Sequence, residues 1–400
     1  MSNRISTTML YQQSLASMQT KQTSLARIQQ QLNTGQKLIT AKDDPVGAGS
    51  AVGLDRALAE LERFGKNGDT IRHRLGMQEN ALAQAGDVMG RITELTVRAN
   101  SASLSDADRQ AIAIEVTSLR DSLFDIANSP DGSGRYLFGG TQDGSPPFAR
   151  ANGGVSYVGD QTQRQVEVAP QLFVTETLPG SEVFLRVRTG DGRIDAGADA
   201  GNTGTGRIGS FNVADSTAWD GGSYRIGFAA DGAYEVTDAA GDVVASGVHA
   251  AGDAIVVNGV RLVLDGTPAD GDSFEIGPAG TRDMFATIDN LLGALSQEPP
   301  TDAQRTAQQN ALQGAMRDIA TAQEHLIDAR ASGGSQLAAL DNADGLRDAQ
   351  GLTIETTLSG LRDLDYVEAI SRFNLEKVAL EAAQLSFMQI QRLSLFDLLR

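Results

Sequence analysis

Both ends of the chain are long segments that contain neither glycine nor proline. Residues 1–34 and 361–400 lack both residue types. Glycine and proline are the residues that most often interrupt helices, so each segment is expected to form one long helix. A heptad pattern in the first segment is formed by Tyr11, Leu15, Met18, Gln22, Leu25, Gln29 and Leu32. Because some of these positions are polar, this helix should be weak alone. Gly35 then follows at the place of a C-terminal cap.

The C-terminal segment carries two neighbouring apolar stripes. One stripe contains Ile370, Phe373, Leu380 and Phe387. The other contains Leu364, Val367, Val378, Leu385, Met388, Leu395 and Leu399. Two adjacent stripes make an apolar face that is too broad for a single partner helix. Packing inside one chain is the common explanation of such a face, and contact with other molecules is the alternative.

Between the two ends, the apolar period changes from helical to strand-like and back. Ser105 and Asp108 have the spacing of a capping box, and the helix that they begin is apolar in heptad register from Ile112 to Ile126. Short strands are then predicted at RYLFGG, VSYVG, RQVEV and LFVTETL. Further strands between residues 181 and 280 are predicted at VFLRV, YRIGFA, AYEVTD, DVVASG, AIVVNGVRLVL and SFEIG. A helical period returns at Thr281.

These patterns predict a mixed, mainly α fold with a nested layout. The terminal helices pair as a coiled coil, the next segments form a helical bundle with a β-hairpin, and an all-β domain is inserted into the bundle. The expected terminal segments are 1–42 and 365–400. The expected helical domain is 43–185 with 281–364, and the expected β insert is 186–280.

Composition excludes several classes of function. The net charge is −18, and residues 181–280 alone hold 15 acidic residues against 6 arginines, which argues against a nucleic-acid partner. The chain has no cysteine, so disulfides and thiolate metal sites are excluded. No apolar run approaches the roughly 20 residues that a membrane span needs. STTMLYQQSLASMQ is too polar for the apolar part of a cleaved secretory signal, so a protein of this sequence that leaves the cell is expected to use another route.

Isolated residues and motifs with catalytic potential have simpler explanations. His73, His249 and His325 are far apart in sequence and belong to no recognisable motif. Gly204 to Gly209 matches the literal GxGxxG pattern, but no convincing strand precedes it and no helical period follows it. We therefore predict no cofactor and no enzymatic activity.

Two groups of aspartates are possible metal ligands. Asp191, Asp195 and Asp199 could bind calcium, but they lack EF-hand spacing and its terminal glutamate, so turn residues are the better interpretation. Asp43 and Asp44 stand before Pro45, which favours the first turn of a helix. The following GAGSAV lacks the Lys-Ser/Thr of a phosphate-binding loop. This stretch is interpreted as a joint between two helices, and no metal site is predicted.

Several motifs stand in order along the chain: ISTTMLYQQSL, TGQKLITAKDDPVGAGSAV, DGSGRYLFGGTQDGSPPF, DLDYVEAISRFN and LSLFDLLR. Together they resemble the flagellin-related family of proteins that join hook and filament in bacterial flagella. The resemblance covers about 1–185 and 281–400 and leaves the β insert unmatched. Flagellin shares the TG…AKDD signature, whereas YQQSL and GRYLFGG are similar to the junction family.

The resemblance implies a flagellin-like architecture in which the terminal helices form the inner coiled-coil core of a tube. Implied partners are further copies of the chain, hook-associated protein 1, flagellin and a flagellar export chaperone that holds the C-terminal helix. Implied localisation is the hook–filament junction outside the cell, after type III export without cleavage. The expected self-assembly face consists of Leu15, Met18, Leu25, Leu32, Ile370, Phe373, Leu380, Leu385, Phe387, Met388 and Leu395.

Two alternatives remain at this point. The chain could be a minor flagellin, which a mutant that lacks the protein would test. It could also be an adhesin or glycan-binding module that acts through the acidic β insert, which a glycan array probed with residues 181–280 would test.

Overall fold

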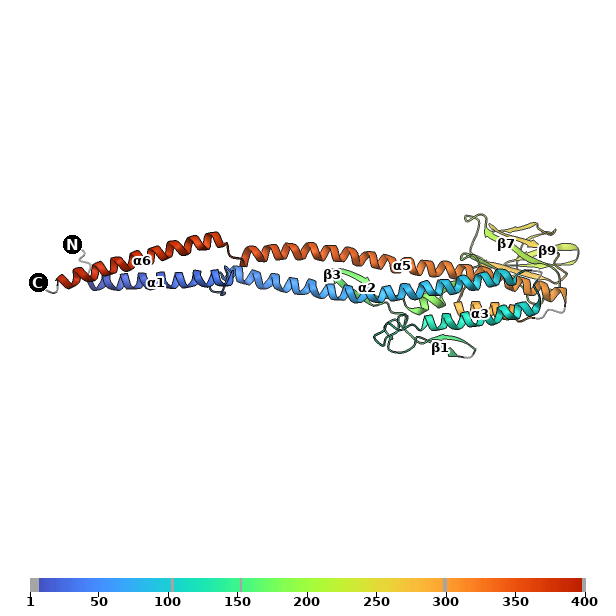
Figure 1. Cartoon of the computed structure of the whole chain (residues 1–400). Helices are drawn as coiled ribbons and strands as arrows, with labels where there is room; N and C mark the ends of the chain where they lie inside the picture. The colour runs from blue at the N-terminus through green and yellow to red at the C-terminus, as the bar shows by residue number, and fades with distance from the viewer. Residues whose placement is uncertain (1–6, 102–103, 152, 298–300, 398–400) are drawn as a thin grey trace. The chain divides into compact units, whose positions relative to one another are not determined.

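The computed structural model describes residues 7–101, 104–151, 153–297 and 301–397 (Figure 1). The helices are α1 (Thr7–Thr34), α2 (Pro45–Ala99), α3 (Asp106–Ala127), α4 (Met284–Leu295), α5 (Asp302–Arg362) and α6 (Tyr366–Asp397). The chain divides into two compact units, one of residues 1–66 with 343–400 and one of residues 67–342. Each unit contains segments from both halves of the sequence, so the nesting expected from the sequence is present.

The first unit is built on α1 and α6, which run side by side and antiparallel (Figure 1). Tyr11 near the start of α1 meets Phe387 near the end of α6, and Lys21 in mid-α1 meets Glu376 in mid-α6. The same unit contains the first part of α2 and the last part of α5. There Arg362 forms a bidentate ion pair with Asp55.

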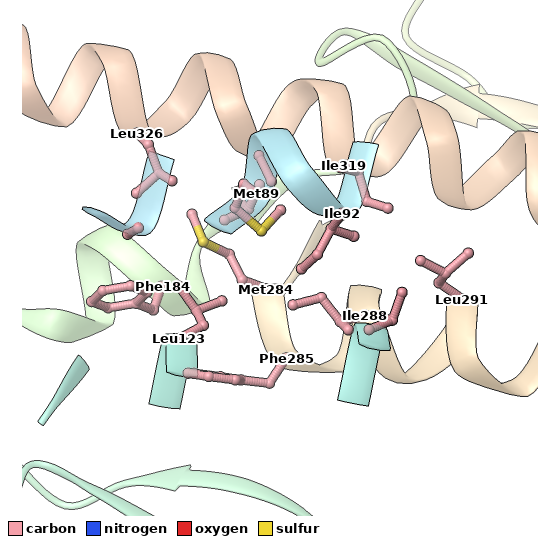
Figure 2. Close-up of a cluster of buried hydrophobic side chains, with 14 of the residues drawn as sticks. Met89, Ile92, Leu123, Phe184, Met284, Phe285, Ile288, Leu291, Ile319 and Leu326 are labelled. Atoms are coloured by element: carbon pink, nitrogen blue, oxygen red, sulfur yellow. The ribbon is translucent and has the colours of Figure 1, made fainter. Parts of the chain in front are cut away.

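The second unit has a helical core to which α2, α3, α4 and α5 all contribute. Figure 2 shows Met89 of α2, Leu123 of α3, Phe285 of α4 and Ile319 of α5 meeting in one cluster. All four side chains are completely buried. Deleting a side chain of this size from such a core typically costs about 2–5 kcal/mol. These contacts therefore dominate the stability of the helical part.

Aromatic rings extend this core toward the short strands. Phe138, Phe148, Phe184 and Phe285 form a connected group with ring centroids 5.1–6.3 Å apart. Most of these contacts are edge-to-face or tilted, which are favourable geometries for aromatic pairs. The group ties α4 to the loops that follow α3.

The segment after α3 folds into a compact turn rather than a strand. The Asp131 carboxylate accepts hydrogen bonds from the amides of Ser133 (2.9 Å) and Arg135 (3.2 Å). Gly140 has a φ of 65°, and a Cβ atom there would lie 2.4 Å from the Asp160 carbonyl oxygen. Only glycine fits this place, which explains the second glycine of RYLFGG.

A buried arginine fixes this turn to α2. The Arg74 guanidinium lies 3.2 Å from the Asp143 carboxylate and 2.9 Å from the Glu176 carboxylate. Arg74 is only 5% exposed, so its charge must be balanced by these acids. The described contacts of Arg74, Asp143 and Glu176 thus stabilise the packing of this loop against α2.

The strands fall into small sheets that are antiparallel throughout. They are β1 (Phe148–Ala151), β2 (Gly154–Tyr157), β3 (Gln165–Ala169), β4 (Leu172–Thr175), β5 (Val187–Arg188), β6 (Ile194–Ala198), β7 (Arg207–Val213), β8 (Tyr224–Phe228), β9 (Ala233–Thr237), β10 (Val243–Val248), β11 (Ala254–Val257), β12 (Val260–Asp265), β13 (Ser273–Pro278) and β14 (Thr281–Arg282). β1 pairs with β2, β3 with β4 and β5 with β14. The helical domain thus carries two hairpins, where one was expected.

The insert consists of a five-stranded sheet, ordered β10-β9-β8-β13-β6, and a three-stranded sheet, ordered β11-β12-β7. Ile194, Ile226 and Phe274 of the larger sheet pack in one core with Ile208 and Leu262 of the smaller one. This core shares no residue with the helical core. The insert therefore encloses an apolar core of its own.

The mixed, mainly α fold with paired end helices and an all-β insert is confirmed. Two strand predictions are wrong. RYLFGG follows the Asp131 turn and makes an isolated bridge from Tyr136 to Pro130, and VFLRV lies mostly in a π-helix at Ser181–Leu185, with Val187 in β5. Strands β1, β6, β7 and β14 were not expected. The finer domain division, with boundaries at residues 43, 186, 281 and 365, stays a prediction beside the two units described above.

Candidate assembly surface

The packed face of the helix pair is set by apolar residues on both helices. Met18, Leu25, Ile28 and Leu32 of α1 are partly buried, as are Phe373, Leu380 and Phe387 of α6. Ala369 is 5% exposed. The predicted stripe with Phe373, Leu380 and Phe387 is thus the one that contacts α1.

The heptad predicted for α1 is correct at alternate positions only. Gln22 and Gln29 are exposed, whereas Lys21 and Ile28 are partly buried and take their places. The Lys21 Nζ atom lies 2.9 Å from a carboxylate oxygen of Glu376. Lys21 can approach α6 because its aliphatic stem packs while its charged end is paired.

Four residues of the second apolar stripe are largely exposed on α6, whereas Leu364, just before the helix, is partly buried. Val367 is 82% exposed, Val378 63%, Leu385 60% and Met388 51%. At about 100° per residue, Val367, Val378 and Leu385 project roughly opposite to Phe387. The expectation of two neighbouring stripes on one broad apolar face is therefore wrong for these three residues. Helix α1 cannot reach them from its side of α6. These four residues are called the open stripe below.

The predicted assembly residues thus fall into two groups. Met18, Leu25, Leu32, Phe373, Leu380 and Phe387 lie in the packed face of the pair. Ile370, Leu385 and Met388 are exposed, and Leu15 is 39% exposed at the margin of the packed face. The side chain of Leu395 lies outside the described residues, although its backbone belongs to α6.

Sequence reasoning missed exposed apolar residues on the neighbouring helices of the same unit. Val46 and Val52 on α2 are 79% and 49% exposed, and Leu346 and Leu352 on α5 are 43% and 67% exposed. These residues stand alone among small and polar residues, so no periodicity marks them. Their presence extends the exposed apolar surface of this unit beyond α6.

The joint between α1 and α2 is held by backbone hydrogen bonds to the end of α5. Gly35 has a φ of 70°, its amide donates to the Gln31 carbonyl at 2.8 Å, and its carbonyl accepts from the Leu364 amide at 3.0 Å. The Lys37 amide donates to the Arg362 carbonyl at 2.7 Å. The joint between α1 and α2 and the joint between α5 and α6 are thereby fixed to each other.

Aspartates at this joint cap turns and helices. Asp43 accepts from the Thr40 amide at 2.9 Å, and Asp44 accepts from the Gly47 amide at 2.9 Å at the start of α2. The amide of Thr40 holds the pKa of Asp43 below its usual value. Asp365 accepts from the Val367 amide at 2.9 Å and caps α6 in the same way. The predicted joint is confirmed, and its acids act as caps.

The other candidate residues also have structural roles. Asp191 and Asp199 accept hydrogen bonds from the backbone amides of their own turns. Gly204, in the GxGxxG match, donates its amide to the buried Asp272 carboxylate at 3.0 Å, and the segment continues into strand β7. Within the described residues, no group of three or more His, Asp or Glu side chains could hold a metal ion.

The histidines lie in three different environments. His73 is exposed, and the Nε2 atom of His325 lies 2.7 Å from the Glu182 carbonyl oxygen. His249 is buried against Phe228, with ring centroids 5.8 Å apart, and burial lowers its pKa. None of them forms a catalytic pair with another described residue. Across the same residues, no helix has the length and apolar content required to cross a bilayer.

Known proteins of the bacterial flagellum are similar to this chain in sequence and in fold. Residues 5–143 match the bacterial flagellin N-terminal helical region. Flagellar hook-associated protein 3 of Escherichia coli (strain K12) is 25% identical over 99% of both chains. The crystal structure of Xanthomonas campestris FlgL is 54% identical with a TM-score of 0.72, covering 76% of this chain and 99% of that one. The flagellar junction protein FlgL of Legionella pneumophila is 26% identical with a TM-score of 0.70, covering 78% of this chain and all of that one.

A flagellin-type N-terminal region, paired end helices and an inserted sheet define a flagellin-related structural protein of bacterial flagella. The identity to the Xanthomonas protein over nearly its whole length makes the assignment more specific. The chain belongs to the FlgL family, the flagellar hook-associated proteins 3. This family forms the hook–filament junction, so the chain is a structural protein of the flagellum, outside the cell.

Proposed function

We propose that the chain assembles into the junction through its terminal helices and that the open stripe of α6 is the contact with neighbouring subunits. The observation that carries this proposal is the exposure of Val367, Val378 and Leu385 on the side of α6 that faces away from α1, with the exposed Met388 on the flank of the helix. Burying one such side chain contributes about 1.5–3 kcal/mol. Every subunit of an assembly makes this contact with its neighbours, so the favourable free energy is repeated at each interface.

Both the packed and the open residues take part in this assembly. The packed set, which includes Leu25 and Phe373, holds α1 and α6 together as an antiparallel helix pair. The open set, which includes Leu385, contacts the next copy. Val46 and Leu352, on α2 and α5, extend the contact beyond the terminal helices.

Hook-associated protein 1 on the hook side and flagellin on the filament side are the proposed partners besides further copies. The match to the flagellin N-terminal region spans residues 5–143 and so includes all of α1 and α2. A subunit with flagellin-type helices can continue a flagellin packing arrangement at one end and adapt to a different protein at the other. In the cytoplasm, an export chaperone that covers the open stripe would prevent premature association.

Export is proposed through the flagellar type III route, unfolded and without a cleaved signal. The absence of cysteine supports passage through an oxidising space without cross-linking. The role is structural and non-enzymatic, which is supported by the capping and core roles of the candidate residues described above.

Gold-labelled antibodies against the chain, applied to intact flagella, test this function. A single ring of label between hook and filament is expected. A strain without the protein should keep its hooks and lose flagellin monomers to the medium. Label along the whole filament, or a normal filament in that strain, would contradict the junction role and favour a minor flagellin.

A further inference from the structure

The connection between the helical core and the sheet insert is narrow. The helical core ends at Val187 and resumes at Met284, while the sheet core begins at Ile194 and ends at Ile276. The chain therefore crosses between the two cores twice, once after Val187 and once before Met284. These two crossings pair with each other through β5 and β14, which are only two residues long each. Two such short strands alone would act as a hinge, because few hydrogen bonds fix their direction.

Helix α5 holds the first crossing through two side chains. The Gly190 amide donates to the Asp318 carboxylate at 2.8 Å, and the Thr321 hydroxyl donates to the Gly190 carbonyl at 2.8 Å. Gly190 has a φ of 63°, and a Cβ atom there would lie 2.2 Å from the Ile194 carbonyl oxygen. The turn is therefore built around glycine, and both of its polar backbone groups bind α5.

The second crossing binds the same carboxylate. Arg282, in β14, forms an ion pair with Asp318, which is 6% exposed. One buried acid thus holds both strands of the connection. Arg317 lies beside this acid on α5, and its guanidinium stacks on Phe211 of β7 with 5.0 Å between the guanidinium carbon and the ring centroid.

A third contact lies about two helical turns from Asp318 and three from Thr321. The Asn310 side chain accepts from the Ile208 amide at 3.1 Å and donates to the Gly206 carbonyl at 3.0 Å. It satisfies the edge of β7 as a neighbouring strand would. From Asn310 to Thr321 the helix rises about 17 Å, at about 1.5 Å per residue. The insert is therefore held over a length of helix and not at one point.

We propose that Asn310, Asp318 and Thr321 form a clamp that turns the insert from a hinged module into a rigid arm with one fixed direction relative to the helical core. Each core is complete without the other, so releasing the clamp frees the insert to swing about β5 and β14 while both cores stay folded. In an assembly built from many copies, the clamp gives every insert the same direction.

Distance measurement between spin labels tests the clamp. The chain contains no cysteine, so Ser118→Cys on α3 and Ala240→Cys on the insert give one exposed label on each side of the connection. With the clamp intact, double electron–electron resonance should show one narrow distance peak. Asp318→Ala should abolish that single peak and give a broad distribution, and Asn310→Ala should broaden it less.

Asp328→Ala, an exposed acid on the same helix, is the matched control and should keep the narrow peak. A second label pair inside the insert, at Ala240 and Ala254, should stay narrow in every variant and so reports that the sheet is folded. If Asp318→Ala does not fold, Thr321→Val removes one clamp bond with little change in volume. A broad distribution with the clamp intact, or a narrow one in folded Asp318→Ala and Thr321→Val, would overturn the proposal.

Discussion

The sheet insert and helix α6 place their apolar side chains in opposite ways. In the insert, Ile226 and Phe274 are completely buried by strands of the same domain. On α6, Val367 and Leu385 are 82% and 60% exposed, although α1 runs along the other side of the helix. A domain that buries its own apolar residues is stable as one chain. A helix that leaves half of them exposed needs neighbouring molecules to bury them, and this difference separates folding from assembly within one protein.

The largest difference in stability is expected between a truncated side chain in the core of the insert and one in the open stripe of α6. Phe274→Ala should destabilise the insert by about 3–5 kcal/mol, because it empties a closed core. Leu385→Ala should change the stability of the free protein by no more than about 0.5 kcal/mol. Trp219 is the only tryptophan and packs against the sheet core, so its fluorescence in urea reports the insert, while far-UV ellipticity reports the helices. Equal losses in the two variants would mean that the open stripe is buried within the monomer.

A smaller loss is expected at the joint that positions the helix pair. Gly35→Ala places a side chain at a φ of 70° and a Cβ atom 2.9 Å from the Tyr366 hydroxyl, so it should destabilise the joint by about 1–2 kcal/mol. Gly49→Ala is the control, since Gly49 lies within α2 with no atom near its missing Cβ, and should stabilise by about 0.5–1 kcal/mol. Hydrogen exchange in α1 and α6 measures both. The same response in both variants would mean that the backbone conformation at Gly35 does not stabilise the helix pair.

Acid should affect the insert and spare the helix pair. Burial lowers the pKa of His249, so the folded insert favours the neutral ring. Its stabilising contribution is complete above the unfolded pKa of about 6.5 and falls below it, by at most about 1.4 kcal/mol per pH unit. Urea unfolding followed through Trp219 at several pH values should show this slope, and His249→Leu should lose it. No histidine lies in α1 or α6, so the protection factors of their amides, corrected for the intrinsic pH dependence of exchange, should not change over this range. A slope that persists in His249→Leu would assign it to other groups.

The smallest effect concerns the ion pair inside the helix pair. Lys21→Met should cost about 0.2–1 kcal/mol, because the Lys21 side chain is 37% exposed and its partner Glu376 is 22% exposed. A double-mutant cycle with Glu376→Gln, measured by hydrogen exchange in α1, gives the coupling, which should shrink as salt is added. A coupling as large as the loss from Phe274→Ala would mean that charge, and not apolar contact, holds α1 to α6.

The sequence predicted the layers of the fold more reliably than the faces of its helices. Glycine-free ends and the change of period identified the terminal helices and the insert. The phase of α1 was ambiguous because its heptad contains polar residues in either register. The partial burial of Ile28 and the contact of Lys21 with Glu376 of α6 decide it. On α6 both stripes are equally apolar, so nothing in the sequence says which one faces α1.

Tertiary contacts explain the strand errors. RYLFGG has strand-like composition, but the Asp131 turn and the buried Arg74 impose a compact loop. Strand β7 was missed because its glycine and asparagine weaken the period, and its edge is completed by Asn310 from a distant helix. Val46 and Leu352 gave no signal, since exposure is a property of the folded unit.

Incorporation of Leu385→Asp into flagella tests whether the open stripe of α6 is the contact between subunits. A carboxylate on the open stripe leaves the monomer's own cores untouched, but burying it against a neighbouring subunit costs several kcal/mol at each contact. Gln384→Asp adds the same charge at the adjacent exposed position, away from the centre of the stripe, and serves as the control. We expect Leu385→Asp to be secreted with unchanged thermal unfolding, to fail to enter the junction and to release flagellin into the medium, while Gln384→Asp should build filaments. Normal filaments with Leu385→Asp, or a much lower melting temperature of its free monomer, would contradict this expectation.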